Sequence, residues 1–194
     1  MEKIKGGVTA AKGFFAAHTA AGIKYQGRDD MALLYSEVPA EVAGTFTQNV
    51  VKAAPVKWDQ QVVKESPYAQ AVVVNAGIAN ACTGEEGMRY CKQTADQAAE
   101  VLKIPANAIL VASTGVIGMQ LPMDRLRAGI QVMAPQLEDT RSAGTAAAQA
   151  IMTTDTHKKE VAVTFMADGK EVTVGAGDMA LSTSATCLLY TSPS

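Results

Sequence analysis

A serine, a threonine and a glycine stand together where an apolar run ends, in the segment "VASTGVIGMQLP" over residues 111–122. Gly115 and Gly118 let the backbone approach a ligand closely, because glycine has no Cβ. A threonine hydroxyl beside backbone N–H groups in such a turn can stabilise a developing oxyanion. The same residues suit an ordinary strand-to-helix turn, in which Ser113 or Thr114 bonds to nearby backbone. Spacing alone leaves both interpretations open and favours the turn.

Two other clusters of small polar residues follow predicted apolar elements. The segment "NAGIANACTGEEG" (residues 75–87) leaves an apolar run through small and amide residues, and such a loop either permits tight packing or shapes a polar pocket. The segment "MTTDT" (residues 152–156) places three hydroxyls and a carboxylate where an alanine-rich helix is expected to end. A polar helix terminus is the simpler explanation of the second cluster. Neither cluster identifies a reaction by itself.

Other catalytic signatures are missing from the sequence. There is no zinc signature, P-loop or pair of glycosidase-like carboxylates, and only His18 and His157 are available as imidazole bases. Neither histidine stands in a recognisable arrangement of nucleophile and base, so we expect both to be ordinary surface or partly buried residues. The three cysteines form no CxxC pair, which argues against a metal site and a disulfide framework and favours a reducing compartment.

Strands must carry these clusters, and five runs have the composition of strands. The runs "AVVVN" and "AILVAS" are apolar without alternation, which is typical of strands covered on both faces. Asp168-Gly169 between the last two runs predicts a hairpin, because both residue types tolerate a positive φ. The five predicted strands cover residues 31–38, 71–75, 108–113, 161–165 and 171–174.

Helical spacing of apolar residues alternates with these strands. Residues 83–105 carry apolar side chains at spacings of three and four, and Thr83 with Glu86 predicts a capping box at the start of this helix. A second helix is predicted from Pro122, and an alanine-rich third covers about residues 142–152. Helix-connected strands together with a hairpin predict an α/β or α+β layered fold.

Size and charge narrow the class of protein. The chain has 194 residues, 48% of them apolar, which is enough to bury the core of one domain or slightly more. Its net charge of −2 comes from scattered charges, so nothing favours a nucleic acid or an anionic membrane as partner. No signal peptide and no apolar stretch of membrane-spanning length is visible. We therefore expect a soluble, cytoplasmic protein.

Six segments, taken in order, resemble the glutamate/ornithine N-acetyltransferase family of arginine biosynthesis. The resemblance covers about residues 6–175, and six ordered segments are far more specific than any one of them. It implies an αββα-type layered sandwich of the N-terminal-nucleophile-like kind, of which this chain is the α half. The segments are "VTAAKGF", "VPAEVAGTFTQNVVKAAPV", "VVVNAGIANACTG", "VASTGVIGMQLPMDRLRAGI", "AIMTTDT" and "DGKEVTVG".

The resemblance also implies a reaction. In this family a precursor cuts itself before a threonine into an α and a β chain, which assemble as an α2β2 heterotetramer. The new N-terminal threonine of the β chain takes the acetyl group from N-acetylornithine and passes it to glutamate. No cofactor is expected, although some members accept acetyl-CoA as acetyl donor. An α chain alone would lack the nucleophile and would be inactive.

The resemblance assigns roles to three residues of this chain. Thr114 and Gly115 match the family's oxyanion hole, with the threonine hydroxyl and the glycine backbone N–H as donors. Thr153 matches the threonine that contacts the substrate, or Thr154 does if the local alignment slips. The "NAGIANACTG" loop resembles a family motif as well, and we expect it to shape the site without taking part in a chemical step.

The last segment departs from the family pattern. Residues 1–175 are predicted to form the α-chain domain, whereas residues 176–194 lack the expected lysine and glycine-serine-glycine run before the cleavage point. The pair Ala185-Thr186 comes about five residues too early, so Thr186 is not expected to be the nucleophile. We expect residues 176–194 to be a non-native or disordered tail.

Two alternatives from other classes remain at this stage. The chain could be a fragment of another self-processing N-terminal-nucleophile enzyme, an amidohydrolase or aminopeptidase, which would hydrolyse an amide or a peptide. It could also be a fragment that binds a ligand or a partner without catalysis, which a genuine tail would favour.

Overall fold

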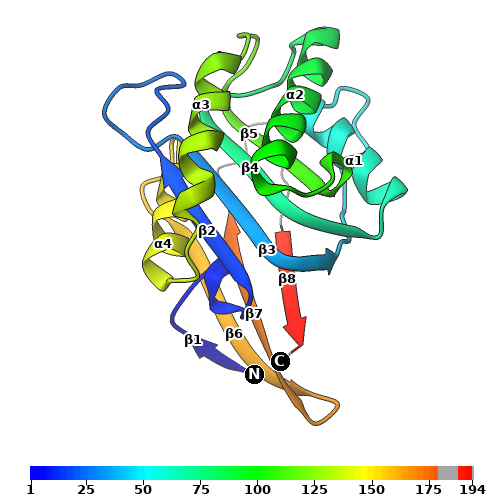
Figure 1. Cartoon of the computed structure of the whole chain (residues 1–194), viewed down its shortest axis with the longest axis vertical. Coiled ribbons are helices and arrows are strands. Elements are labelled where there is room, and N and C mark those ends of the chain that lie inside the picture. Colours follow the sequence, from blue (N-terminus) through cyan, green and yellow to red (C-terminus); the bar gives the residue numbers. More distant parts are fainter. Residues whose placement is uncertain (179–187, 194) are drawn as a thin grey trace.

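Two four-stranded sheets form the framework of the computed structural model, which describes residues 1–178 and 188–193 (Figure 1). One sheet has the strand order β2-β3-β4-β5, and the other has the order β1-β6-β7-β8. All neighbouring strands are antiparallel except β4 and β5, which are parallel. The strands are β1 (Glu2–Ile4), β2 (Phe14–Thr19), β3 (Met31–Glu41), β4 (Tyr68–Ile78), β5 (Ile109–Val116), β6 (Lys159–Ala167), β7 (Lys170–Asp178) and β8 (Leu188–Pro193).

Helices cover the β2-β3-β4-β5 sheet on both faces. On one face, strand residues such as Leu33, Val73 and Ile109 pack with residues of α2 and α3, among them Ala95 and Ile130. On the opposite face, alternate strand residues pack with the alanines of α4, on the side of the second sheet. The helices are α1 (Ala54–Glu65), α2 (Gly84–Leu102), α3 (Met123–Met133) and α4 (Arg141–Ala150), with short 3-10 turns at Val8–Ala10, Ala106–Ala108 and Ala134–Gln136.

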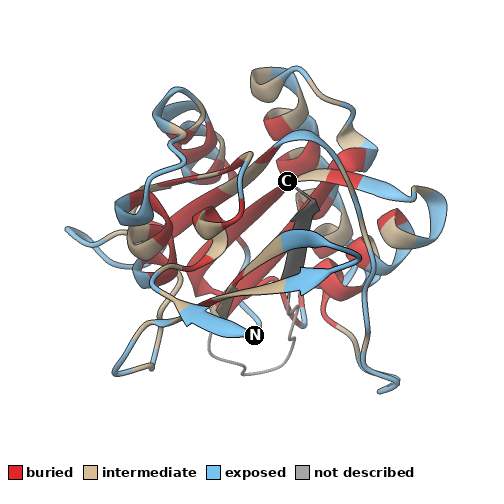
Figure 2. Ribbon diagram, turned by 90° about the horizontal axis from the view of Figure 1, so that it is seen from below, coloured by how far each residue is buried: buried red, intermediate tan, exposed pale blue. Residues whose placement is uncertain are grey.

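Burial is concentrated in β4 and β5 at the middle of this layered arrangement (Figure 2). The last eight residues of β4 and the first six of β5 are all buried, as the uninterrupted apolar runs predict for strands covered on both faces.

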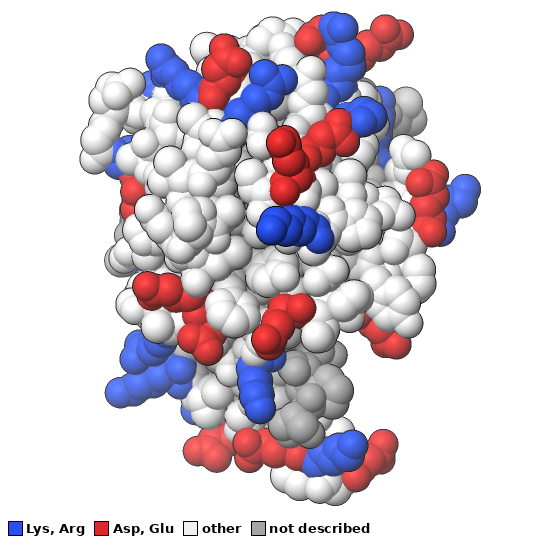
Figure 3. All heavy atoms as spheres, viewed as in Figure 1, with Lys and Arg blue, Asp and Glu red and all other residues white. Residues whose placement is uncertain are grey.

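Surface charges of both signs are interspersed on the face seen in Figure 3. Among the described residues, no helix is long and apolar enough to cross a membrane.

Several predicted elements are confirmed. All five predicted strands and the three predicted helices are present, with boundaries shifted by a few residues. Asp168 and Gly169 form the turn between β6 and β7 with φ of +49° and +78°, as predicted for the hairpin. The tail predicted for residues 176–194 begins inside β7 and contains β8, which pairs with β7. The origin of that segment stays a prediction.

The capping box predicted at the start of α2 is wrong. Thr83 is the N-cap residue, but it makes no side-chain capping bond: its φ of −104° and ψ of 3° are not the extended values usual at an N-cap, and its hydroxyl donates to Asn80 Oδ1 at 2.7 Å. Glu86 instead forms an ion pair with Arg89. Sequence reasoning also missed α1, although Pro55 in its first turn and the buried residues Val56 and Val62 are signals of a helix.

Helix α1 covers the free edge of β5 by direct side-chain hydrogen bonds. Trp58 Nε1 donates to the carbonyl oxygen of Ile109 at 3.0 Å, and Asp59 Oδ1 accepts from the backbone N–H of Val111 at 2.9 Å. Asp59 is 1% exposed, and its Oδ2 has no hydrogen-bond partner among the residues that the structure describes. Burial raises the pKa of the Asp59 carboxyl from 3.8 to about 8. Near neutral pH the Asp59 carboxyl is therefore protonated, and it is this uncharged carboxyl that bonds to the edge strand.

The buried carboxyl predicts a pH dependence of stability. Between pH 4 and 8 the folded chain keeps a proton on Asp59 that the unfolded chain has released, because the folded pKa is about 8 and the ordinary value is 3.8. Raising the pH in this window therefore favours unfolding, by at most about 1.4 kcal/mol per pH unit. We expect Asp59→Asn to remove this contribution, as measured by urea unfolding at pH 5 and pH 8. The exposed control Asp139→Asn should keep the wild-type dependence. An unchanged pH dependence in Asp59→Asn would contradict the assignment.

Candidate functional site

The carboxyl ends of β4 and β5 lie side by side and bring two of the predicted polar clusters together. Asn75 pairs with Ser113, Ala76 with Thr114, and Gly77 with Gly115. Parallel neighbours end at the same edge of a sheet, which is where open α/β sheets bind ligands. The "NAG" and "STG" segments therefore form one structural unit, which spacing along the sequence does not reveal.

Ser113 serves the fold of this edge. Its hydroxyl donates to the carbonyl oxygen of Ile78 at 3.1 Å and accepts from the backbone N–H of Asn80 at 2.9 Å. Asn75 Nδ2 donates to the same Ile78 oxygen at 2.7 Å. Asn80 Nδ2 in turn donates to the carbonyl oxygen of Gly87 at the start of α2. The interpretation of the serine as a residue that satisfies nearby backbone is thus confirmed for Ser113.

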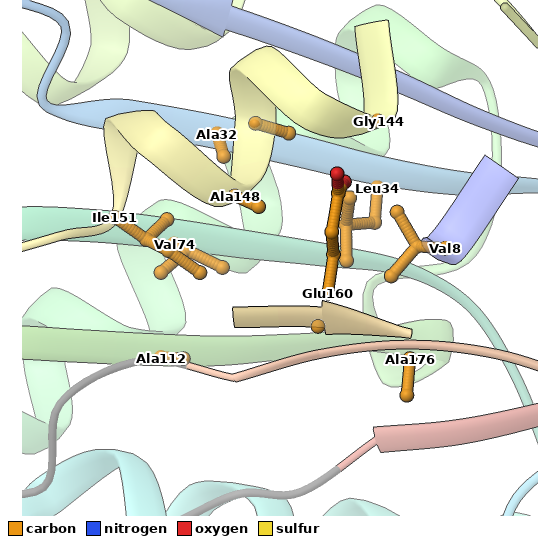
Figure 4. A pocket seen from close by; sticks show the side chains of 12 residues that line it. Val8, Ala32, Leu34, Val74, Ala112, Gly144, Ala148, Ile151, Glu160 and Ala176 are labelled. Atoms are coloured by element: carbon orange, nitrogen blue, oxygen red, sulfur yellow. The ribbon is translucent and has the colours of Figure 1, made fainter. Parts of the chain in front are cut away.

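Thr114 lies on the other face of β5. Side chains alternate along a strand, so Thr114 shares its face with Leu110 and Ala112, which belong to the cluster that packs with α4. Thr114 is 3% exposed. Ala112 and Val74 line a cavity of about 40 Å³ between this sheet, α4 and strands β6 and β7 (Figure 4). The Thr114 side chain is therefore directed to the space between the two sheets.

The lining of this cavity is apolar except for one carboxylate. Figure 4 shows Glu160 reaching from β6 toward α4, among small residues that include Ala32 and Ala148. Both Glu160 oxygens accept from Thr145 Oγ1, at 3.1 and 3.0 Å, and Glu160 Oε1 lies 3.2 Å from Lys158 Nζ. These partners neutralise the carboxylate, so the described part of the cavity offers mainly apolar contact.

Gly115 is fixed by its contact with the neighbouring strand. Its φ is +133°, and a Cβ at this position would lie 2.3 Å from the carbonyl carbon and 2.4 Å from the carbonyl oxygen of Gly77. Gly77 itself has a φ of +103°. The neighbouring strand therefore leaves no room for a side chain at position 115, whereas a Cβ on Gly77 would meet Lys24 and not Gly115.

Thr153 lies beside the segment that joins β2 to β3 (residues 20–30), because Arg28 of that segment bonds to the preceding residue, Met152. It follows the C-cap of α4 and is half-buried, whereas Thr154 is exposed. Arg28 Nη2 donates to the carbonyl oxygen of Met152 at 2.6 Å. The backbone N–H of Ala76, the register partner of Thr114, donates to the carbonyl oxygen of Asp30 at 2.8 Å. Residues 20–30 thus connect Thr153 with the strand ends that carry Thr114 and Gly115.

Asp155 holds the turn of the "MTTDT" segment. Asp155 Oδ1 lies 2.8 Å from Lys159 Nζ, and the hydrogen bond from Lys159 holds the pKa of Asp155 below its ordinary value. Asp155 is therefore ionised at neutral pH, which fixes the turn that carries Thr153.

The two histidines are partly buried and exposed residues, as predicted. His18 Nδ1 lies 2.7 Å from Asp29 Oδ2, and His157 is exposed. Within residues 1–178 and 188–193, no cluster of His, Cys, Asp and Glu could hold a metal ion. Thr186 lies outside the described residues.

Sequence reasoning missed the role of residues 20–30, where Gly22, Gly27 and a run of charges signal a structured loop.

The two sheets, their helical cover and the paired glycines define a layered α/β protein whose polar strand ends form a candidate ligand site. The chain belongs to the ArgJ family, whose model matches residues 15–187. It is similar to the crystal structure of the arginine biosynthesis bifunctional protein argJ from Bacillus halodurans, with a TM-score of 0.88, 38% identity and 96% of each chain covered. It is also similar to ornithine acetyltransferase from Mycobacterium tuberculosis, solved in complex with ornithine, with a TM-score of 0.84 and 42% identity over 95% of this chain and 96% of that one.

Curated relatives agree with this membership. The arginine biosynthesis bifunctional protein ArgJ of Gloeobacter violaceus is 47% identical over 174 residues, and that of Symbiobacterium thermophilum is 51% identical over 178 residues. These matches cover 90% and 91% of this chain but only 42% and 44% of the relatives. The chain therefore spans less than half the length of these relatives. The predicted family and the predicted layered α/β fold are confirmed.

The contact between the paired glycines predicts a specific sensitivity to substitution. We expect Gly115→Ala to lower the free energy of unfolding by about 3 kcal/mol or more, because it adds overlap with fixed backbone to the strain of a positive φ. Gly118→Ala is the matched control, since Gly118 also has a positive φ, of +77°, but its Cβ would meet nothing within 4 Å. Urea unfolding of both variants measures the difference. Equal losses for the two variants would show that the contact with Gly77 contributes nothing.

Proposed function

We propose that this chain is the α portion of an acetyltransferase that moves an acetyl group from N-acetylornithine to glutamate. The observation that carries the proposal is the Thr114-Gly115 pair at the joint end of β4 and β5, in a member of the ArgJ family. The printed names of its relatives, a bifunctional protein of arginine biosynthesis and an ornithine acetyltransferase, support this substrate class. The proposed location is the cytoplasm.

The proposed partner is a β chain cut from the same precursor, which supplies an N-terminal threonine as nucleophile. A terminal α-amine has an ordinary pKa of about 8, so a sizeable fraction is neutral near pH 7 and can accept the proton of the adjacent hydroxyl. This amine makes a histidine base unnecessary, which agrees with the positions of His18 and His157. The complete assembly is proposed to be an α2β2 heterotetramer.

In the proposed reaction, the threonine oxygen attacks the acetyl carbonyl carbon of N-acetylornithine, and the carbonyl oxygen becomes negatively charged. The Thr114 hydroxyl and the Gly115 N–H donate hydrogen bonds to this oxyanion. When the tetrahedral intermediate collapses, the C–N bond breaks and ornithine leaves with the proton on its amine. The amine of glutamate then attacks the carbonyl carbon of the acetyl-threonine ester, and a second oxyanion forms at the same place. The C–O bond of the ester breaks, a proton from the glutamate amine returns to the threonine oxygen, and N-acetylglutamate leaves.

Thr153 is proposed to contact the substrate through its hydroxyl. It follows the apolar Ile151, which lines the cavity between the sheets, and residues 20–30 connect its segment to the strand ends. No cofactor takes part in the proposed transfer, with acetyl-CoA as an alternative acetyl donor. The small residues of the "NAGIANACTG" loop are proposed to shape the site, through the packing of Gly77 against Gly115.

Reconstitution tests the proposed activity. We expect no acetyl transfer from the 194-residue chain alone, because the nucleophile is supplied by the β chain. Co-expression of the α region, completed with the sequence of its source gene, and the β region of that gene should give N-acetylglutamate and ornithine from N-acetylornithine and glutamate. Chromatographic quantification of both products measures the transfer. Robust turnover by the chain alone would contradict the proposed division of roles, and release of free acetate without N-acetylglutamate would favour a hydrolase.

Thr114→Val in the reconstituted enzyme tests the oxyanion assignment. Losing one such donor costs about 2.7 to 4 kcal/mol in the barrier, so we expect kcat to fall about 100-fold to 1,000-fold with little change in KM. Thr94→Val is a suitable control, because Thr94 is also a buried threonine but its hydroxyl bonds to the Tyr90 carbonyl oxygen within α2. A fall of less than about tenfold, or 1.4 kcal/mol, in Thr114→Val would contradict the assignment.

A further inference from the structure

The segment between β2 and β3 is held firmly by contacts at both of its ends. Both carboxylate oxygens of the buried Asp30 accept backbone N–H groups, from Ala21 at 2.8 Å and from Ile23 at 2.5 Å. Arg125, in the first turn of α3, donates to the carbonyl oxygen of Gly22. Arg28 donates to the carbonyl oxygen of Met152. Residues 21–30 therefore form a fixed structure, which is held by its own Arg28 and by Arg125 of α3.

Lys24 lies against the end of β4, next to the end of β5 that carries the proposed oxyanion site. A Cβ on Gly77 would lie 3.0 Å from Lys24 Cβ and 3.7 Å from the Lys24 backbone nitrogen. Gly77 is in turn the register partner of Gly115, and their backbones are in direct contact. The lysine thus projects from a point one strand away from Gly115, and neighbouring strands are about 4.8 Å apart.

The ammonium group of Lys24 has no anionic partner among the described residues. Its only recorded contact is with the Tyr25 ring, whose centroid lies 4.9 Å from Lys24 Nζ. Arg28 Cζ lies 5.4 Å from the centroid of the same ring. Lys24 is exposed, so its positive charge is available to a ligand. A second cation on the same ring increases the local positive potential, which attracts a carboxylate.

We propose that Lys24 binds the carboxylate of the amino-acid substrate in the acetyl-transfer site. The inference rests on the proposed function, because both N-acetylornithine and glutamate carry an α-carboxylate next to the nitrogen that bears or receives the acetyl group. One cation beside the oxyanion site can therefore orient the donor and then the acceptor. The Lys24 side chain is long enough to reach a carboxylate over the end of β4, because its stem already lies against Gly77.

A purely structural role for Lys24 makes a different prediction. If the lysine only packs its stem on Gly77, then Lys24→Met, which keeps an unbranched stem without the charge, should bind substrate as the wild type does. If Lys24 binds the carboxylate, this variant should lose affinity for both substrates, and Lys24→Arg should recover part of it. The exposed Lys64 at the end of α1 provides a matched control for removing one positive charge.

The experiment measures steady-state kinetics of the reconstituted α and β enzyme with N-acetylornithine and with its α-carboxamide analogue. We expect Lys24→Met to raise KM for N-acetylornithine and for glutamate about tenfold or more, with a smaller effect on kcat. Wild type should discriminate against the carboxamide, and Lys24→Met should discriminate much less, because the charge that recognises the carboxylate is gone. Lys64→Met should behave as wild type does in both measurements.

The outcomes separate the two proposals. Undiminished discrimination against the carboxamide in a folded Lys24→Met or Lys24→Gln variant would overturn the role of Lys24 while leaving the acetyltransferase intact. Absence of transfer in the reconstituted wild type would overturn the proposed function, and the role of Lys24 with it. Circular dichroism and the unfolding midpoint of each variant establish that the fold is retained.

Discussion

The direct backbone contact between Gly77 and Gly115 determines how the candidate site is built. The two residues are in register on the parallel strands β4 and β5, and the backbone of Gly77 leaves no room for a side chain at Gly115. Both have positive φ, so each strand turns away from regular geometry at the same level. In the same register Thr114 lies beside Ala76, and the two strands end together one residue after the glycines.

Ser113 and Thr114 lie on opposite faces of β5. Ser113 faces α2 and α3, where its hydroxyl bonds to Ile78 and Asn80 and holds the loop after β4. Thr114 faces the space between the sheets, on the side of α4 and the apolar cavity. Neighbouring hydroxyls therefore lie in different surroundings, because side chains alternate between the two faces of a strand. The edge of β5 is protected as well, since Trp58 and Asp59 bond to its outer backbone groups.

Much of the fold could be predicted from the sequence, because β4 and β5 are uninterrupted apolar runs and α2 and α4 have clear helical spacing. The hairpin at Asp168-Gly169 was equally predictable, since its turn chemistry is local. The capping box of α2 failed for a local reason, because Thr83, with φ of −104° and ψ of 3°, does not have the extended backbone usual for an N-cap residue, and its hydroxyl donates to Asn80.

The candidate site was predictable only in part. The family motifs predict roles for Thr114, Gly115 and Thr153, and these roles stay predictions. Spacing could not show that β4 and β5 end together or that Ser113 and Thr114 face opposite sides. Lys24 and Arg28 gave no local signal of a site. Their position depends on Asp30, Arg125 and Met152, which lie on three different parts of the chain and meet only in the folded structure.

A crystal structure of the reconstituted α and β enzyme, trapped as the acetyl-threonine intermediate, would test the central claim most directly. We expect the acetyl carbonyl oxygen to lie about 2.7 to 3.1 Å from both Thr114 Oγ1 and the backbone nitrogen of Gly115. An acetyl oxygen that points away from β5, with other groups of the protein as its donors, would contradict the role proposed for the joint end of β4 and β5.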